Sequence, residues 1–210
     1  MKREEKNALS RQRIVEAALQ EFSAKGYGCA SLNTVCAEHD ISKGIIYHYF
    51  KDKDELYLVC VKECFEALTA HIKQSMACFC GTPKQRLQEY FDARLRFFAE
   101  NPLYLGIFAD AALSPPTALL EKIAVCRRRF DELNVSILTA FLNSQHVREG
   151  LSVPAVVEDF RIYMDFFNMR FKEAFQENAH FEAVLQEHEE RCHRQLDILL
   201  HGVLGENHEQ

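Results

Sequence analysis

The chain has 210 residues and a mass of 24.3 kDa, which is enough for one large domain or two small ones with a buried core. Hydrophobic residues make up 48% and charged residues 27%, with 8 Gly and 5 Pro, and this composition excludes a collagen-like fibre and general disorder. The 25 Lys and Arg against 31 Asp and Glu give a net charge of -6. The protein is not a polycation, so any nucleic-acid site has to be local.

The first residues, MKREEKNALSRQR, are rich in charge and lack the apolar stretch of a secretory signal, so a cytoplasmic location is expected. The longest mostly uncharged segment, Pro102 to Leu120, contains Asp110 and two adjacent prolines, so no membrane span is predicted. The eight cysteines then predict reduced thiols rather than a disulfide framework. Their spacing contains no four-ligand zinc pattern, and neither a metal site nor a cofactor is predicted.

The first predicted element is a helix from Arg11 to Lys25, with Ser10 as its cap and Gly26 as its end. Apolar residues recur along this segment at helical spacing, which indicates one buried face. That face consists of Ile14, Ala17, Ala18, Leu19 and Phe22.

Two short helices follow. Ser31 is expected to cap the first of them, which runs to about His39, and Ser42 to cap the second, from Lys43 to Tyr49. Asp40 and Ile41 then form a tight turn between them, and the pair makes a helix-turn-helix. Asp52 and Glu55 have the spacing of a capping box, which predicts the start of a long fourth helix.

Glycine and proline clusters divide the rest of the chain into further amphipathic helices. These clusters are Gly81-Thr82-Pro83, Asn101-Pro102, Ser114-Pro115-Pro116 and residues 150–154. The last two helices, about 154–176 and 181–203, have long apolar stripes. The first of these two also carries Ile162, Phe166 and Met169 on another side, and a helix that is apolar on two faces needs two neighbours. The predicted fold class is therefore all-α.

The segment SLNTVCAEHDISKGIIYHYFKDKDEL, residues 31–56, resembles the DNA-binding domain of TetR-type transcriptional regulators. The ending LDILLHGVLG resembles the closing helix of that family, and the middle matches only in length and helical character. The resemblance implies a helix-turn-helix domain over residues 1–52 and a larger helical effector-binding and dimerisation domain over residues 53–210. The segment departs from the family pattern at two positions: His39 stands where a small residue is usual, and Asp40 where Gly is usual in the turn. Asp tolerates the left-handed turn conformation better than most residues, so the turn is expected to form.

The family motif places a set of residues at the DNA. Serines at helix N-termini can cap or contact phosphates, Gly44 allows close approach of the backbone, and Lys43 reaches a phosphate or a guanine edge. Ile45 has no hydrogen-bonding group, so it would read a base by apolar contact with a thymine methyl. Tyr47 and His48 resemble the family's phosphate-contacting pair. The full predicted set is Ser31, Thr34, Ser42, Lys43, Gly44, Ile45, Tyr47, His48 and Lys53.

Neighbouring residues of the motif are expected to form the small core instead. These are Ile41, Ile46, Tyr49 and Phe50. Residues 1–50 hold seven Lys and Arg against six Asp and Glu, a net charge of +1 that leaves -7 for the remainder. The basic residues near the N-terminus form either an arm that touches the DNA backbone or a solvated tail. They are Lys2, Arg3, Lys6, Arg11 and Arg13.

The middle of the chain is aromatic, and bulky planar side chains in a helical domain can enclose an apolar cavity for a small hydrophobic or aromatic effector. Arg94 either meets a ligand carboxylate or extends to solvent, and Asp110 either holds a cationic ligand or faces solvent. The residues assigned to this effector site are Phe91, Arg94, Phe98, Tyr104, Phe108, Asp110, Phe130, Tyr163 and Phe167.

Three pairs carry thiols or imidazoles at short spacing: Cys60 and Cys64, Cys78 and Cys80, and His188 and Cys192. Two ligands do not close a tetrahedral metal site, and small buried thiols are ordinary core residues, so each pair is either packing or a sensor. The sequence has no Gly-rich phosphate loop and no nucleophile-elbow pattern, so the protein is not predicted to be an enzyme.

The leading prediction is a ligand-responsive transcriptional repressor that binds a palindromic double-stranded DNA operator. The repressor is a homodimer, formed through the last two helices of each chain. It leaves the operator when a small organic effector binds. A thiol- or metal-responsive regulator on the same fold is the first alternative, and a helical cytosolic enzyme is the second.

Overall fold

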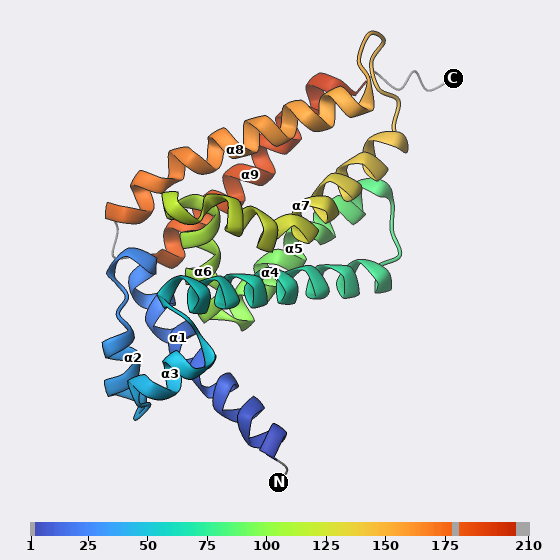
Figure 1. The fold of residues 1–210 in the computed structure, drawn as a ribbon. Coiled ribbons are helices and arrows are strands. Elements are labelled where there is room, and N and C mark those ends of the chain that lie inside the picture. The colour runs from blue at the N-terminus through green and yellow to red at the C-terminus, as the bar shows by residue number, and fades with distance from the viewer. Residues whose placement is uncertain (1–2, 178–180, 205–210) are drawn as a thin grey trace. The chain divides into compact units, whose positions relative to one another are not determined.

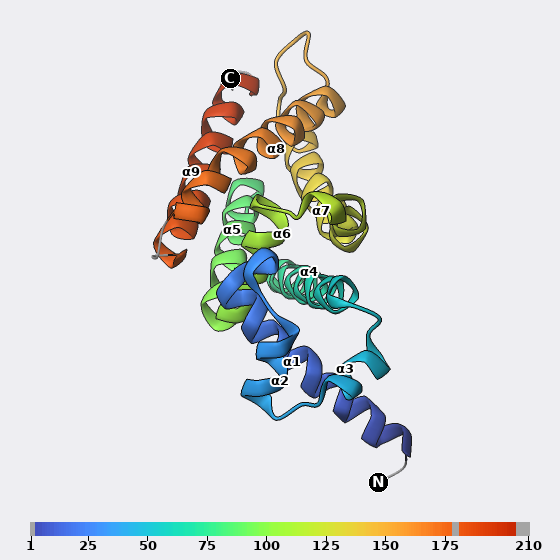
Figure 2. The same ribbon diagram turned by 60° about the vertical axis from the view of Figure 1, so that its left-hand side comes forward.

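The computed structural model describes residues 3–177 and 181–204, without the side chains of Arg3, residues 168–177 and 181–185, and Glu189. The described chain is a succession of helices (Figures 1 and 2), and its β-structure is limited to one isolated bridge between Val147 and Leu204. The predicted all-α class is therefore confirmed. The helices fall into two compact units, residues 1–67 with 100–128 and residues 68–99 with 129–210.

The first unit begins with α1, Arg3–Cys29, followed by α2, Leu32–His39, and α3, Lys43–Tyr49. Figures 1 and 2 show α2 and α3 close to α1. Apolar side chains from these helices and their connections are almost completely buried and form the core of the helix-turn-helix. They include Ile14, Val15, Ala18, Phe22, Val35, Ile41, Ile46 and Phe50.

Local sequence chemistry explains the turn between α2 and α3. Asp40 adopts the left-handed conformation, with φ 51° and ψ 47°, and its backbone N–H bonds the carbonyl of Cys36. A short polar side chain tolerates this conformation better than other non-glycine residues. The substitution of Asp for the usual glycine therefore leaves the turn intact, as expected from the sequence.

The first unit is completed by the first part of α4, Lys53–Cys78, by α6, Pro102–Leu113, by a short 3-10 helix, Thr117–Leu119, and by the start of α7, Leu120–Asn143. Helix α6 packs on α1. At their contact, a Cβ on Gly106 would lie 2.4 Å from the carbonyl oxygen of Ser23, so this approach requires glycine.

The second unit contains the end of α4, α5 (Pro83–Glu100), most of α7, α8 (Val153–Glu177) and α9 (Phe181–Val203). Helices α8 and α9 pack against each other (Figure 1). The connection between α7 and α8 is fastened to the end of α9, because the backbone N–H of Arg148 donates to the carbonyl of Val203 at 3.0 Å and its guanidinium donates to that of Gly202 at 2.9 Å.

Most expected element bounds are confirmed, with one clear exception. Helix α1 begins at Arg3 rather than Arg11, so Ser10 lies inside a helix and does not cap it. Gly26 has φ 67° and ψ 169°, and it interrupts α1 without ending it, since helical residues continue to Cys29. Acidic Glu4 and Glu5 in the first turn favour the longer helix by interacting with its dipole.

The two compact units do not coincide with the predicted boundary after residue 52, because α4 runs through both and α6 packs on α1. A functional division at residue 52 therefore stays a prediction. Within the described residues, no single helix is long and apolar enough to span a membrane; α6 and residues 117–143 meet those criteria only together, as a bent pair.

Candidate DNA-binding site

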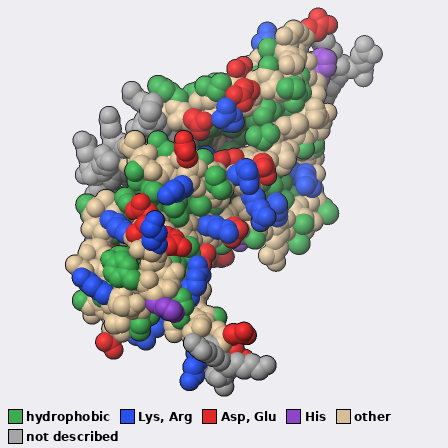
Figure 3. Space-filling model, in the orientation of Figure 1, with side chains coloured by type: hydrophobic (Ala, Val, Ile, Leu, Met, Phe, Trp, Pro, Cys, Tyr) green, Lys and Arg blue, Asp and Glu red, His purple; other side chains and the backbone are tan. Residues whose placement is uncertain are grey.

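Helix α3 presents one buried side and one exposed side. Ile46 is completely buried, whereas Ile45 is 46% and Tyr47 is 56% exposed. Ser42, Lys43, Gly44 and His48 are exposed too, so six of the nine predicted DNA contacts lie on the free surface of this short helix and its cap. Figure 3 shows Lys and Arg side chains over this part of the molecule. A helix anchored by one apolar face and open on the other can enter a major groove.

The two predicted caps are present. Ser31 Oγ accepts a hydrogen bond from the backbone N–H of Asn33 at 3.2 Å, and Ser42 Oγ accepts one from Ile45 at 3.3 Å. Each serine thereby satisfies one of the free N–H groups at a helix start. The other N–H groups of the first turn and the positive end of the helix dipole favour an anion at such a helix start, so a phosphate contact at Ser31 and Ser42 stays a prediction.

Glu21 of α1 fixes the start of α2. Its carboxylate is 5% exposed and accepts hydrogen bonds from the backbone N–H of Ser31 at 2.9 Å and from the hydroxyl of Thr34. Lys25 forms an ion pair with it at 2.8 Å. Burial acts to raise the pKa of Glu21, but the bonds from Lys25, Ser31 and Thr34 outweigh it and lower that pKa. Thr34 is therefore held within the domain as well as half-exposed at its surface.

Lys53, at the start of α4, is positioned by an aromatic ring. Its Nζ lies 4.5 Å from the ring centroid of Tyr27, a cation–π contact. The Tyr27 hydroxyl donates to Asp54 Oδ1 at 2.5 Å, and this bond, together with burial, raises the pKa of Tyr27 to about 12. The end of α1 therefore orients the cation predicted to pin the DNA backbone.

Asp110 of α6 joins three helices of the first unit. Its Oδ2 accepts hydrogen bonds from the hydroxyl of Tyr57 in α4 at 2.6 Å and from the backbone N–H of Tyr27 in α1 at 3.0 Å. A Cβ on Gly26 would lie 2.9 Å from its Oδ1, so the break in α1 fits around this carboxylate. Asp110, expected either to hold a cationic ligand or to face solvent, is half-buried and accepts hydrogen bonds from its own chain. Sequence analysis missed Tyr57 and Tyr27, because the bonding partners are 53 and 83 residues away from Asp110.

Two of the basic residues expected in an N-terminal arm or a solvated tail make contacts inside the domain instead. The Arg13 guanidinium donates to the carbonyl of His39 at 2.8 Å, and that of Arg11 lies 5.1 Å from the centre of the Phe50 ring. Both therefore brace the helix-turn-helix. The predicted core is confirmed for Ile41, Ile46 and Phe50, while Tyr49 is half-exposed. Lys2 lies outside the described residues, as does the side chain of Arg3.

The predicted effector residues are distributed over both units. Tyr104, Phe108 and Asp110 belong to the first, and the other six belong to the second. Most of the rings are core: Phe91, Phe98, Phe108 and Phe130 are at most 7% exposed. Tyr163 stacks on Phe167 with ring centroids 6.1 Å apart.

Arg94 is the buried cation of this set. It is 7% exposed, and its guanidinium donates to the Tyr90 hydroxyl at 3.1 Å and lies 5.6 Å from the centre of the Phe130 ring. The Tyr90 hydroxyl bonds Asn134 Oδ1 in turn, at 2.7 Å. Arg94 therefore lies among aromatic and polar groups rather than extending to solvent.

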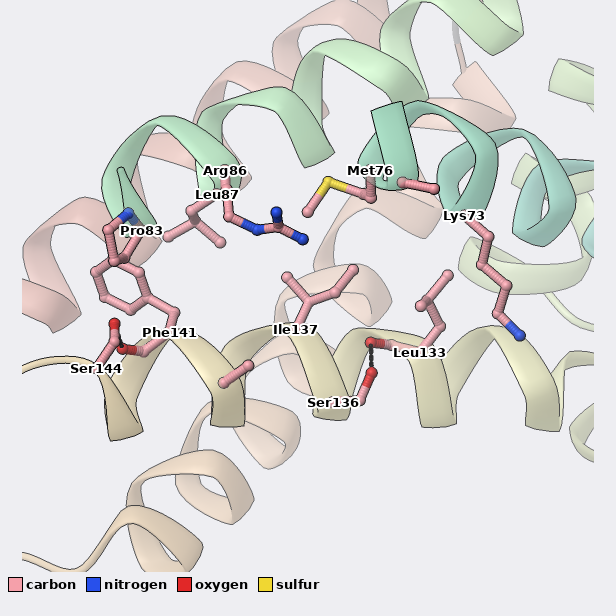
Figure 4. Close-up of a pocket in the computed structure, with 12 residues that line it drawn as sticks. Lys73, Met76, Pro83, Arg86, Leu87, Leu133, Ser136, Ile137, Phe141 and Ser144 are labelled. Atoms are coloured by element: carbon pink, nitrogen blue, oxygen red, sulfur yellow. Dashed lines mark hydrogen bonds between the residues drawn. The ribbon is translucent and has the colours of Figure 1, made fainter. Parts of the chain in front are cut away.

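A cavity of about 470 Å³ lies within the second unit, between the end of α4, the start of α5 and the second half of α7 (Figure 4). None of the predicted effector residues lines it, and their assignment stays a prediction. Its lining consists of Lys73, Met76, Ala77, Pro83, Arg86, Leu87, Leu133, Ser136, Ile137, Ala140, Phe141 and Ser144. The sequence analysis used aromatic residues to locate an effector site, whereas most of the residues that line this cavity are not aromatic.

The cysteines differ in environment. Cys60 and Cys64 are buried, and burial raises the pKa of each thiol, which favours packing over reactivity. His188 and Cys192 are buried as well, with Sγ 3.7 Å from Nε2. Cys78 and Cys80 are exposed, so a sensing role for that pair stays a prediction. No group of three His, Cys, Asp or Glu that would suit a metal ion occurs among the side chains that the structure describes.

The first unit thus has the architecture of a helix-turn-helix protein, with a capped recognition helix exposed on one side. Comparison with known proteins shows which class of helix-turn-helix protein this segment resembles. Residues 14–60 match the family model of bacterial regulatory proteins of the tetR family. The match covers the helix-turn-helix segment, and the resemblance of the sequence to TetR-type transcriptional regulators is confirmed.

Three relatives show the extent of the similarity. The transcriptional repressor KstR of Mycolicibacterium smegmatis is 32% identical over 108 residues, 49% of this chain and 52% of that protein, so the match spans about half the length of such curated relatives. A putative TetR family transcription regulator from Shewanella sp. PV-4 shares the fold over 94% of this chain and 99% of its own, with TM-score 0.63 and 19% identity. The regulator FadR of Bacillus subtilis, solved in complex with stearoyl-CoA, has TM-score 0.61 and 19% identity, covering 84% of this chain and 96% of its own.

Proposed function

We propose that the protein is a transcriptional repressor that binds double-stranded operator DNA through α3 and acts in the cytoplasm. The observation that carries this proposal is the surface of α3: Ile46 is fully buried while Ile45 and Tyr47 are about half exposed. Lys43 and the capped start of the helix supply charge and free N–H groups for phosphates. The repressor role is suggested by relatives such as KstR, whose name states it.

The protein binds DNA as a homodimer. The two subunits associate through α8 and α9. Ile162 and Phe166, one turn apart on α8, are 55% and 57% exposed, and Ile198 on α9 is 58% exposed. Large apolar side chains gathered on a surface mark an interface, and a symmetric partner covers such a patch with its own copy. Two recognition helices related by a two-fold axis then fit a palindromic operator with half-sites about 34–36 Å apart.

A small organic effector regulates the binding. An effector releases the DNA only if it binds the DNA-free conformation better than the DNA-bound one, because differential affinity alone moves the equilibrium. FadR, a neighbour in fold, was solved in complex with stearoyl-CoA, a small organic ligand with a long apolar chain, which supports an organic effector for this protein.

The test of this function is a Tyr47→Phe substitution, with Tyr163→Phe as the matched control in the second unit. The operator is first selected from random-sequence duplexes, and affinities are then measured by fluorescence anisotropy. We expect Tyr47→Phe to weaken operator binding about tenfold, or about 1.4 kcal/mol, because its hydroxyl bonds a phosphate. The control should bind like the wild type. Selection of no sequence, or equal affinity for both variants, would contradict the proposal.

A further inference from the structure

The cavity between α4, α5 and α7 has apolar walls and a charged rim of one sign. Met76, Leu87 and Ile137 are among the side chains that form the walls. Lys73 comes from α4 and Arg86 from α5, whereas none of the described lining residues is Asp or Glu. Figure 4 shows Arg86 extending into the space between Met76 and Ile137, and Lys73 reaching down beside Leu133. Two cations on separate helices therefore face one apolar space.

The hydrogen-bond donors of this cavity are concentrated in those two cations. Ser136 Oγ donates to the carbonyl of Leu133 at 2.8 Å, and Ser144 Oγ donates to that of Phe141 at 2.6 Å. Both hydroxyl protons are used by carbonyl groups of α7, so these serines offer a ligand only acceptor oxygens. A ligand that needs a donor from the protein must take it from Lys73 or Arg86.

Arg86 is held in place but has donors to spare. Its Nη1 donates one hydrogen bond, at 3.3 Å, to the carbonyl of Phe79, the residue that follows α4. A guanidinium has five N–H donors in a planar fork that matches a carboxylate. Lys73 forms no ion pair with any residue the structure describes. A carboxylate at the rim would therefore receive charge-assisted hydrogen bonds without displacing an acidic residue.

We propose that this cavity binds an apolar carboxylate, with the aliphatic body among the side chains of α4, α5 and α7 and the carboxylate at Arg86 and Lys73. A volume of about 470 Å³ falls within the range of small-molecule sites. A cationic amphiphile meets two like charges and no carboxylate. A neutral alcohol of the same length forgoes the charge-assisted bonds. The inference rests on the proposed function, because it assigns the chemical class of its effector.

The test uses decanoate, 1-decanol and decyltrimethylammonium, which share a ten-carbon chain and differ in head group. Each is titrated into the DNA-free protein by isothermal titration calorimetry, below its micelle concentration. Decanoate should bind at least tenfold tighter than decanol, and the cation should bind most weakly. Equal affinities, tighter binding of the cation, or no binding of decanoate would each overturn the proposal.

Variants locate the site. Arg86→Gln and Lys73→Gln should each weaken decanoate binding about tenfold and leave decanol binding unchanged. Lys84→Gln, which removes an exposed cation outside the cavity two residues from Arg86, should change neither. Ala140→Phe places a ring in the cavity from an exposed position and should weaken both ligands. Unchanged decanoate affinity in Arg86→Gln and Ala140→Phe, with unaltered melting temperatures, would place the ligand elsewhere and refute the assignment.

Operator release is measured separately, by anisotropy of labelled DNA. Decanoate that binds as predicted but does not release DNA would leave the cavity assignment standing and contradict the effector role. Specific DNA binding with no decanoate binding would refute the cavity assignment and leave the repressor function standing.

Discussion

Asp110 accepts a hydrogen bond from the hydroxyl of Tyr57 at 2.6 Å, and the same carboxylate oxygen accepts the backbone N–H of Tyr27 at 3.0 Å. One half-buried carboxylate in α6 is thereby tied to α4 and to the end of α1. The Tyr27 side chain continues the connection, because it bonds Asp54 and carries Lys53 on its ring. If α6 moves relative to α1 and α4, these hydrogen bonds must break or the bonded residues must move with it. Asp110 therefore connects α6 to the candidate DNA contact Lys53.

The titration of Asp110 should change the free energy of unfolding with pH. Burial raises its pKa above the ordinary 3.8, by more than the bonds from Tyr57 and Tyr27 and the charge of Lys53 lower it. The folded protein therefore keeps this proton to higher pH than the unfolded chain. The resulting contribution to stability is complete below pH 3.8 and is lost as the pH rises through the folded-state pKa.

Asp110→Asn does not titrate, so the comparison isolates this group. The difference in unfolding free energy between the variant and the wild type should move in favour of the variant as the pH rises from below 3.8 to neutral. Urea denaturation across that range measures it. A difference that is constant with pH would contradict the raised pKa.

Two glycines offer a contrast between binding and folding. A Cβ on Gly44 meets no atom within 4 Å, so Gly44→Ala should stabilise the exposed helix by up to about 1 kcal/mol while weakening operator binding at least tenfold, because the methyl separates the backbone from the DNA. Gly106→Ala forces its Cβ against a backbone oxygen of α1 and should cost about 1–3 kcal/mol of stability. Denaturation and anisotropy measure the two effects. Undiminished operator affinity in Gly44→Ala would contradict a close approach of α3.

Ile45 is expected to read a thymine methyl, since it is 46% exposed on α3 and has no polar group. Replacing the contacted thymine by deoxyuridine, which lacks only that methyl, should cost the wild type about 0.8 kcal/mol, or roughly fourfold in affinity. Ile45→Ala should bind both duplexes with similar, weaker affinity. A wild type indifferent to deoxyuridine at every thymine of the operator would exclude this contact.

Phe166→Glu should convert the dimer to a monomer, because it places a charge in the apolar patch of α8. Leu151→Glu is the matched control: Leu151 is 46% exposed but lies in the connection between α7 and α8. Sedimentation velocity distinguishes the two forms. A dimer that persists in Phe166→Glu and dissociates in Leu151→Glu would move the interface away from α8 and α9.

The helix-turn-helix was predictable because its signals are local. Ser31 and Ser42 cap helices that begin at the next residue, and Asp40 sits in the turn conformation its side chain tolerates. The Asp52 carboxylate accepts the N–H of Glu55 as the capping box predicts, but Glu55 reaches the N–H of Lys51 rather than that of Asp52. Hydrogen bonds between neighbours in sequence decide all of these features.

Long-range partners explain what the sequence did not reveal. Gly26 was expected to end α1. The backbone N–H of the next residue, Tyr27, donates to Asp110, which lies 83 residues further along the chain. The spacing of apolar residues in the sequence does not predict such a distant partner. The aromatic residues assigned to the effector posed a similar problem. Phe98 and Phe130 are buried in packing, and a hydrophobic pattern does not distinguish a packed side chain from one that lines a cavity.

The most direct test of the account is a titration of the selected operator across a series of salt concentrations, with a scrambled duplex as control. We predict tight binding of two subunits per operator, much weaker binding to the scrambled duplex, and a logarithm of the affinity constant that falls linearly with that of the salt concentration as phosphate contacts are lost. Equal affinity for both duplexes, or no binding even at low salt, would contradict the assignment of α3 as a sequence-reading helix.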